Sequence, residues 1–335
     1  MNRSRVLDSS SEPMKTTENG IGETNVDEID ANEIDANEID TCHVSVMPDE
    51  VVYWVADPTV AETPTKIVVD GTYGGGGHSR LLLEALPADD VRVIGLDRDP
   101  AVSARVSSET HDPRLTVFLA SYEQVPKALD QFDLTAADAL VLDLGLSSDQ
   151  LADRERGFSY TVDGPLDLRF DPENGVPASR WLAMHDEKQI ADAIYQYGEE
   201  RFSRRIARAI VAKQRERQPI NTVNELVEIC RRCVPRSRNH DIHPATRTFQ
   251  ALRIAVNDEL GILERTLRDA PNWIAPGGRM VIISFHSLED RIVKNAFRED
   301  DRWEILTKKP LRPTESEVAH NARSRSAKLR VARRR

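Results

Sequence analysis

Residues 66–84 read Lys66-Ile-Val-Val-Asp70-Gly-Thr-Tyr-Gly74-Gly-Gly-Gly77-His-Ser-Arg-Leu-Leu-Leu-Glu84, an apolar run that turns through four glycines into a helix-like stretch. Only glycine takes positive φ at low cost and lets the backbone approach a ligand closely. The following helix would point free N–H groups and its positive dipole end at that ligand. The segment therefore predicts a small anionic or zwitterionic cofactor after a first parallel strand, although a tight turn without a ligand would use glycine equally well.

Outward from this turn, short β-branched apolar runs alternate with helix-compatible stretches, as in buried parallel strands with crossover helices. The runs are 67–70, 91–97, 115–119, 139–143 and 279–284, the last of them after the turn Ala275-Pro-Gly-Gly278. Between about 151 and 245 this strand signal disappears. In 202–210 apolar residues recur every four positions among arginines, which predicts an amphipathic helix, and a capping residue in 221–226 opens another. We therefore expect an α/β sheet with a helical insertion.

Asp97 ends the second strand-like run, where a carboxylate can accept both hydroxyl hydrogens of a ribose. It could also be a solvated turn residue, but its position after strand, glycine turn, helix and strand favours a ribose-containing cofactor. The missing Gly-Lys-Ser/Thr disfavours a nucleoside triphosphate. NAD prefers Gly-x-Gly-x-x-Gly, and the nearest match here ends in Ser79. S-adenosylmethionine has no pyrophosphate and suits a looser glycine turn, so it is compatible with the pattern.

Polar residues follow two more predicted strands. Asp143 ends the fourth run and should face the crevice that the glycine turn lines, because the carboxyl ends of parallel strands share one edge. His286 follows the late run and can act as acid, base or hydrogen-bond donor, although a single histidine is more often structural. For Arg154, Arg156, Asp163 and Asp167, mutual ion pairing and substrate contact are equally compatible with the sequence.

Charge is unevenly spread along the 335 residues, whose formal net charge is −11. Residues 1–42 hold 3 Lys and Arg against 11 Asp and Glu and carry a five-residue repeat that fits neither helix nor strand, so we expect a disordered acidic arm. Residues 302–335 hold 11 Lys and Arg against 3 acids, which indicates either a frayed terminus or an RNA-contacting tail.

Few cysteines and the lack of a secretory signal or an apolar run of about 18 residues favour the cytoplasm over secretion or membrane insertion. Cys230 and Cys233 extend an apolar helix face, so we expect buried thiols. No metal site is predicted, and His240-Asp-Ile-His243 is only a weak candidate for one.

Several separated blocks together resemble the bacterial small-subunit ribosomal RNA methyltransferase H (MraW-type) family, which methylates N4 of a cytidine in 16S rRNA. The resemblance covers about 43–330 and is carried by Asp70-Gly-Thr-Tyr-Gly-Gly-Gly-Gly-His-Ser79, Arg156-Gly-Phe-Ser159, Asp163-Gly-Pro-Leu-Asp-Leu-Arg169, Thr248-Phe-Gln-Ala-Leu-Arg-Ile-Ala-Val-Asn257 and Ile283-Ser-Phe-His-Ser-Leu-Glu-Asp-Arg291. The opening at His43 departs from the family's usual pattern.

The resemblance implies a class I S-adenosylmethionine-dependent methyltransferase fold, a Rossmann-like sheet with an inserted helical domain. Its partner would be 16S rRNA or the small ribosomal subunit, with no membrane, and a homodimer stays open. The cofactor positions that it carries over are Gly76, Gly77 and His78 at the methionine end, Asp97 at the ribose, Tyr122 near the adenine, and also Asp143 and Gln150. We expect Asp143 first, and His286 second, to accept the proton from the amine.

The expected division of the chain has five parts. They are an acidic arm over 1–42, the first part of the methyltransferase core over 43–150, a helical insertion over 151–245, the second part of the core over 246–301 and a basic C-terminal tail over 302–335.

Overall fold

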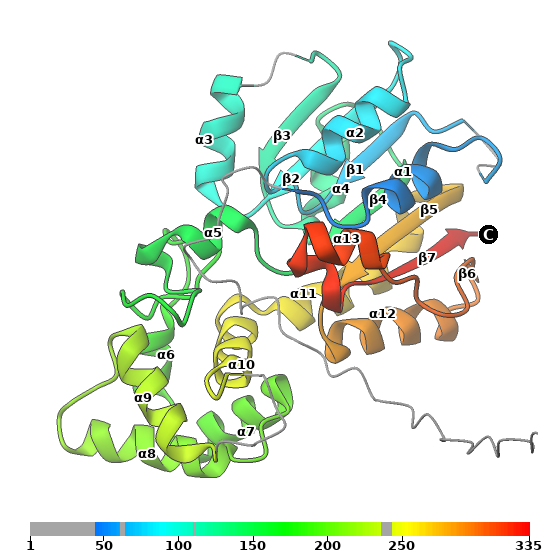
Figure 1. Cartoon of the computed structure of the whole chain (residues 1–335). Helices are drawn as coiled ribbons and strands as arrows, with labels where there is room; N and C mark the ends of the chain where they lie inside the picture. The colour runs from blue at the N-terminus through cyan, green and yellow to red at the C-terminus, as the bar shows by residue number, and fades with distance from the viewer. Residues whose placement is uncertain (1–43, 61–63, 110–111, 236–242) are drawn as a thin grey trace, which may run out of the picture.

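The computed structural model describes residues 44–60, 64–109, 112–235 and 243–335. The acidic arm predicted over 1–42 lies outside the described residues. Figure 1 shows two parts in the rest of the chain, a twisted sheet flanked by helices and a separate group of helices beside it. We call these the sheet domain and the helical lobe.

The sheet has seven strands in the order β3-β2-β1-β4-β5-β7-β6. The first five are parallel, and β7 runs antiparallel to both of its neighbours. The strands are β1 (Ile67–Asp70), β2 (Arg92–Asp97), β3 (Leu115–Leu119), β4 (Ala137–Asp143), β5 (Ile274–Ser284), β6 (Trp303–Ile305) and β7 (Lys328–Arg334). This is the Rossmann-like sheet of the class I methyltransferases, so the predicted fold class is confirmed.

Helices cover both faces of the sheet because successive strand side chains point to opposite sides. Val68 packs on one face with α1 (Pro48–Ala56) and α2 (Gly77–Ala85). Its neighbour Val69 packs on the other face with α4 (Val125–Asp130), α11 (Glu259–Asp269) and α12 (Ser287–Glu299). A further helix, α3 (Pro100–Glu109), lies between β2 and β3 in the chain. The near-continuous apolar runs found in the sequence are therefore buried on two sides.

The predicted start of the last parallel strand is wrong. β5 begins at Ile274, which pairs with Ala137, rather than at Arg279. The Ala275-Pro-Gly-Gly278 segment is an irregularity inside the strand, where the register with β4 shifts between Ala137 and Ala139. Gly277 takes a φ of 81° there. A proline and two glycines thus mark a bulge and not a turn outside the sheet.

The C-terminal segment is not a separate basic tail. Its last strand, β7, lies between β5 and β6, and Leu329 and Val331 are fully buried. Two cations of this strand have acidic partners, because Arg330 Nε lies 2.6 Å from Asp290 Oδ1 and Arg333 Nη2 lies 2.7 Å from Glu304 Oε2. Neutralised arginines and alternating apolar residues allow a formally basic sequence to form an internal strand.

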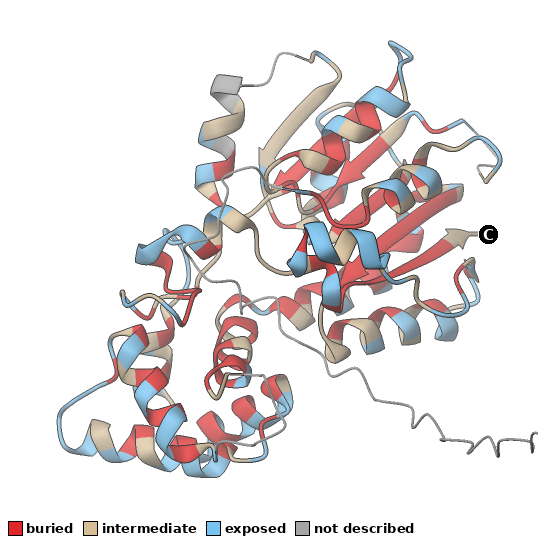
Figure 2. Cartoon of the chain, in the orientation of Figure 1, coloured by how far each residue is buried: buried red, intermediate tan, exposed pale blue. Residues whose placement is uncertain are grey.

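The helical lobe has its own apolar core (Figure 2). Its helices are α6 (Ala178–Met184), α7 (Glu187–Gly198), α8 (Ser203–Arg215), α9 (Val223–Cys233) and α10 (Thr246–Asn257). The predicted amphipathic helix is α8, and Thr222 caps α9 as predicted. Cys230 and Cys233 are buried in this core.

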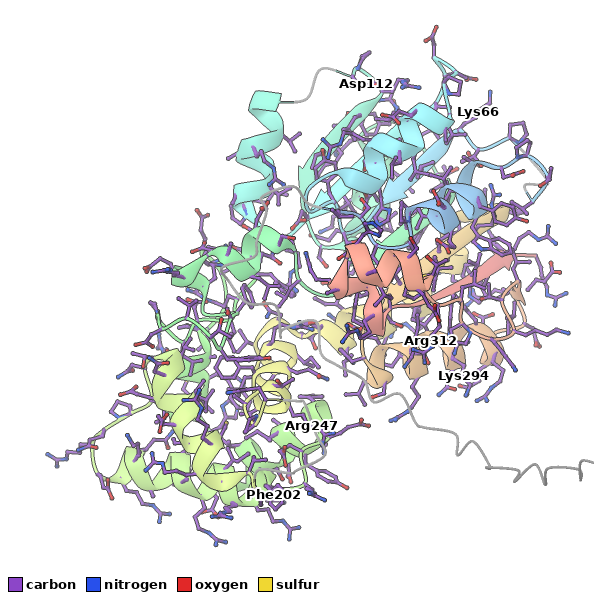
Figure 3. The ribbon with its side chains drawn as sticks, viewed as in Figure 1. Lys66, Asp112, Phe202, Arg247, Lys294 and Arg312 are labelled. Atoms are coloured by element: carbon purple, nitrogen blue, oxygen red, sulfur yellow. The ribbon has the colours of Figure 1, made fainter. Side chains whose placement is uncertain are left out.

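The helical lobe extends beyond the boundary expected at 245. Phe249 and Leu252 of α10 are buried in the same core as α7 and α9, so α10 packs with the lobe and not against the sheet. Figure 3 shows its Arg247 in the lobe together with Phe202, which precedes α8. Within the described residues, none of the helices combines the length and apolar character needed to cross a membrane.

Candidate functional site

A cavity opens at the carboxyl edge of the sheet, where β1, β2, β4 and β5 end. It encloses about 970 Å³ when the space open to solvent is included. Four of the predicted site residues line it, namely Asp97, Tyr122, Asp143 and Gln150. They come from separate segments, and the edge of a parallel sheet is where such segments converge.

The glycine turn contributes to this cavity through its first half. Gly71 and Gly74 line the wall, and Gly74 takes a φ of 49°. Gly76 precedes α2 with a φ of 73°, and a Cβ there would lie 2.5 Å from Tyr73 Oη. Gly77 begins α2. Gly76, Gly77 and His78 are therefore not part of the lining, and the first two shape the turn behind it.

Asp97 is held by the backbone of its neighbours. Its Oδ2 accepts a hydrogen bond from Gly74 N at 2.8 Å, and its Oδ1 accepts one from Asp99 N at 2.9 Å. Burial raises the pKa of Asp97 to about 6, although these two hydrogen bonds oppose the shift. An ionised carboxylate has about four acceptor sites, so acceptor capacity remains for hydroxyl groups of a ligand.

Tyr122 and Gln150 form further parts of the wall. Tyr122 begins the short helix η1 (Tyr122–Gln124), and burial together with the charges of Glu259 and Glu289 raises its pKa. Its neutral ring offers a flat apolar surface. Gln150 closes a capping box with Ser147 at the start of α5 (Ser148–Ala152) and donates from Nε2 to Asp99 Oδ2 at 3.1 Å.

Asp143 has a free acceptor atom. Its backbone N–H donates to Thr72 Oγ1 at 2.7 Å, which fixes the end of β4 against the glycine turn. Asp143 Oδ2 lies 3.4 Å from Nε2 of the buried His78. Its buried Oδ1 has no hydrogen-bond partner among the described residues. Because an unpaired buried acceptor is costly, this atom is suited to receive a donor from a ligand.

His78 supports Asp143 from behind the cavity wall. Burial by itself lowers the pKa of this imidazole, but the Asp143 and Asp70 carboxylates outweigh it, so the pKa is raised. The two carboxylates thus favour the protonated imidazole.

His286 does not reach the cavity lining. It is the N-cap of α12, where its Nδ1 accepts from Glu289 N at 3.4 Å and its Nε2 lies 3.2 Å from Glu289 Oε1. The neighbouring Phe285 and Glu289 do line the cavity. Burial alone raises the pKa of Glu289, but His286 and Arg253 outweigh it, so the pKa is lowered.

The loop after α5 is held together internally. Arg156 Nη2 lies 3.1 Å from Asp99 Oδ2 and donates to the carbonyls of Arg169 and Phe170. Arg169 pairs with Asp167 at 2.7 Å. The carboxylate of Asp163 accepts a hydrogen bond from the backbone of α9. Arg156 and Asp167 thus form ion pairs, but with Asp99 and Arg169 and not with each other. The loop brings the ring of Phe170 to the cavity.

Sequence reasoning missed four charged residues of the wall, namely Arg98, Glu259, Glu289 and Arg323. Glu259 begins α11 and lies 2.9 Å from Arg253 Nε. Glu289 belongs to the block after β5, in which the sequence pattern points only to His286. Arg323 belongs to the segment expected as a tail. Among the described residues no group of three or more His, Cys, Asp or Glu could hold a metal, and most of His240-Asp-Ile-His243 lies outside them.

Comparisons with known proteins agree on one family. The model of the MraW methylase family matches residues 40–335. Ribosomal RNA small subunit methyltransferase H of Rhodopirellula baltica (strain DSM 10527 / NCIMB 13988 / SH1) is 71% identical over 303 residues, which span 88% of this chain and 92% of that protein. The protein of the same name from Synechococcus sp. (strain CC9311) is 48% identical over 88% of this chain and 93% of its own length.

Among solved structures, an rRNA methylase from Streptococcus thermophilus is similar over 86% of this chain and 94% of its own, with 11% identity and a TM-score of 0.37. A likeness this distant supports no further conclusion. The family model and the relatives each cover most of the chain, so the chain belongs to the MraW methylase family.

Proposed function

We propose that this protein transfers a methyl group from S-adenosylmethionine to the N4 amino group of a cytidine in small-subunit (16S) ribosomal RNA. The observation that carries the proposal is Asp143, a carboxylate that lines the cavity and has an oxygen without a hydrogen-bond partner among the described residues. An amine acceptor must lose a proton during methylation, and such an oxygen can take or hold it. The names of the curated relatives supply the ribosomal substrate.

The cavity residues fit the proposed donor. Asp97 has acceptor capacity left for two ribose hydroxyls, and Tyr122 offers a flat surface for an adenine. Gly74 brings backbone to the wall, where a methionine moiety could lie against it, and Gln150 closes the wall near the ribose. We assign Gly76, Gly77 and His78 to shaping the methionine end from behind. When bound, S-adenosylmethionine supplies an electrophilic methyl group on a sulfonium centre.

Asp143 is the proton acceptor that we propose. The lone pair of a cytosine amino group is delocalised into the ring, so the site must orient the nitrogen and accept one of its hydrogens. Asp143 Oδ1 is free for that hydrogen, and His78 Nε2 lies 3.4 Å from the other oxygen. His286, the second candidate, is assigned instead to positioning Glu289, because it caps α12 beside Glu289 and does not line the cavity.

The two described cysteines favour nitrogen over a ring carbon as the methylated atom. Methylation of a pyrimidine ring carbon would call for covalent addition of a nucleophile such as a thiolate. Cys230 and Cys233 lie in the core of the helical lobe, and burial raises the pKa of Cys230 to about 12. Neither lines the cavity. Direct transfer to an exocyclic amine needs no such nucleophile.

The helical lobe offers a surface for the RNA. α8 carries five Lys and Arg and no acid, and its Arg204 and Arg208 are exposed. In Figure 1 α8 lies on the side of the lobe away from the sheet, so an RNA that reaches both must span the lobe. Single-stranded RNA regions can present an unstacked base to a cavity while basic residues hold the backbone. Such a substrate implies a cytoplasmic protein, and a homodimer is not needed for the site.

The test is methyl transfer from methyl-labelled S-adenosylmethionine to small ribosomal subunits, with Asp97→Ala as the inactive control. Label in the RNA of the wild-type reaction alone is the expected result. A dehydrogenase would instead bind NADH and change its fluorescence, and a noncatalytic RNA-binding protein would bind RNA without consuming donor. Either of those results, with no transfer to any form of the subunit, contradicts the proposal.

A further inference from the structure

Arg323 brings a positive charge to the cavity from the C-terminal segment. It belongs to the short helix η4 (Ala322–Ser326), which precedes β7. Its Nη2 donates to the carbonyl of Leu146 and its Nη1 donates to Ser148 Oγ, so it fastens the loop that follows β4. Arginine has five N–H donors, and these two hydrogen bonds leave three for a ligand.

The charge of Arg323 is not neutralised within the described part of the chain. Both of its hydrogen-bond partners are neutral oxygens, and its buried Nε has no partner. Asp143 and Asp149 act on it only from longer range, and burial still lowers its pKa. Asp149 is itself paired with Arg105. A buried cation without a counter-ion is costly, so this arrangement is suited to a site that an anion completes.

The order of the strands indicates which reactant, the donor or the RNA, lies near Arg323. β7 starts beside the carboxyl end of β5, where Lys328 pairs with Ser284, and η4 immediately precedes it. Arg323 therefore approaches the cavity from the β4 and β5 side. Asp97, which we assign to the ribose of the donor, ends β2 on the other side of β1. The anion that meets Arg323 is thus expected beyond Asp143, on the acceptor side.

We propose that Arg323 binds a backbone phosphate of the RNA next to the target nucleotide. This rests on the proposed function and names a binding group for its acceptor. A guanidinium matches phosphate oxygens in geometry and charge. By holding Leu146 and Ser148 at the same time, Arg323 would couple arrival of the phosphate to the position of the loop that follows Asp143. The carboxylate of the donor is the competing anion, and the test separates the two.

The experiment compares Arg323→Gln and Arg323→Lys with wild type and with Arg312→Gln. Arg312 is an exposed residue of the same C-terminal segment, labelled in Figure 3, and its replacement removes the same charge. For each protein, the affinity for small-subunit ribosomal RNA is measured over a range of salt concentrations, and the affinity for S-adenosylhomocysteine by calorimetry. Thermal unfolding reports whether each variant is folded.

The expected result is that Arg323→Gln weakens RNA binding about tenfold and lowers the slope of log affinity against log salt by about one. Arg323→Lys should keep most of that slope and weaken binding about threefold, because it keeps the charge but not the fork of donors. Affinity for S-adenosylhomocysteine should be unchanged in all four proteins. If Arg323→Gln does not fold, the milder effect of Arg323→Lys still tests the phosphate assignment.

Three results would overturn the proposal. Weaker binding of S-adenosylhomocysteine with unchanged RNA binding would assign Arg323 to the carboxylate of the donor. An equally large effect of Arg312→Gln would show that the loss of net charge, and not the loss of a specific contact, weakens RNA binding. Unchanged RNA affinity in a folded Arg323→Gln would show that no phosphate binds there. Wild-type binding of S-adenosylhomocysteine tests the proposed function separately, because the Arg323 result is a difference between variants in RNA binding.

Discussion

The two ends of the cavity differ in how their carboxylates are held. Asp97 at the end of β2 accepts hydrogen bonds from two backbone N–H groups, one of them from the glycine turn. Asp143 at the end of β4 has one oxygen near His78 and the other without a partner among the described residues. Both oxygens of Asp97 have hydrogen-bond donors before a ligand arrives. One oxygen of Asp143 gains a donor when a ligand binds. We therefore assign binding of the donor to the first and chemistry at the acceptor to the second.

The largest effect is expected from Asp143→Asn. Asparagine keeps the shape of the side chain but cannot take a proton, so turnover should fall about 10²-fold or more, the scale of general base catalysis. Single-turnover methyl transfer with saturating donor and RNA measures it. Asp149→Asn is the control, because Asp149 lies outside the cavity lining on α5, the helix that follows β4. If Asp143→Asn keeps more than about a tenth of the turnover, Asp143 is not the proton acceptor.

Asp97→Asn should weaken donor binding about 10- to 100-fold, because an amide offers one oxygen and no charge in place of two charged acceptors. Calorimetry with S-adenosylhomocysteine measures the change. The matched control is Asp130→Asn, which removes an exposed carboxylate from α4. If Asp97→Asn and wild type bind S-adenosylhomocysteine equally well, Asp97 does not bind the ribose. The proposed difference between the two ends of the cavity is then wrong.

Donor binding should also depend on pH through Asp97. Its pKa is raised to about 6, and ribose hydroxyls donate to the ionised form. Affinity for S-adenosylhomocysteine is therefore full above about pH 6 and should fall as pH drops below that value, by at most about tenfold per pH unit. Asp97→Asn should show no such decline. A wild-type profile that is flat between about pH 5 and 8, or that rises toward low pH, contradicts this assignment.

The smallest effect is expected at α8, far from both ends of the cavity. The double variant Arg204→Gln, Arg208→Gln should weaken RNA binding a few-fold and lower its salt slope by roughly 0.7 for each phosphate that is no longer neutralised. Donor affinity should not change. Lys127→Gln on α4 is the control for net charge, since this exposed lysine lies on the sheet domain. If the control weakens binding as much as the double variant, α8 is not an RNA-binding surface.

Much of the sheet could be predicted because a strand buried on both faces is a near-continuous apolar run. β7 could not, because Arg330 and Arg333 interrupt its apolar alternation and pair with Asp290 and Glu304 of other elements. The bulge in β5 resembles a turn in sequence because proline and glycine mark both. In each case the deciding partner lies in another strand or helix.

The residues of the cavity wall also differ in how far the sequence predicts them. Asp97 and Asp143 follow directly from the ends of predicted strands, whereas the positions of Tyr122 and Gln150 follow only from the family resemblance. Glu259 and Arg323 reach the wall from helices whose placement depends on packing of the whole chain, and no local pattern marks them. Sequence therefore indicates the wall residues at strand ends better than those that reach the wall from distant helices.

The central claim is the chemical identity of the product, and nucleoside analysis of the methylated RNA tests it most directly. Small subunits treated with the protein and S-adenosylmethionine are digested, and the methylated nucleosides are identified by mass spectrometry against standards. We expect N4-methylcytidine with the wild-type protein and about a hundredth of that amount or less with Asp143→Asn in the same reaction time. A methyl group on a ring carbon or a ribose hydroxyl, or on a base other than cytosine, would contradict this claim.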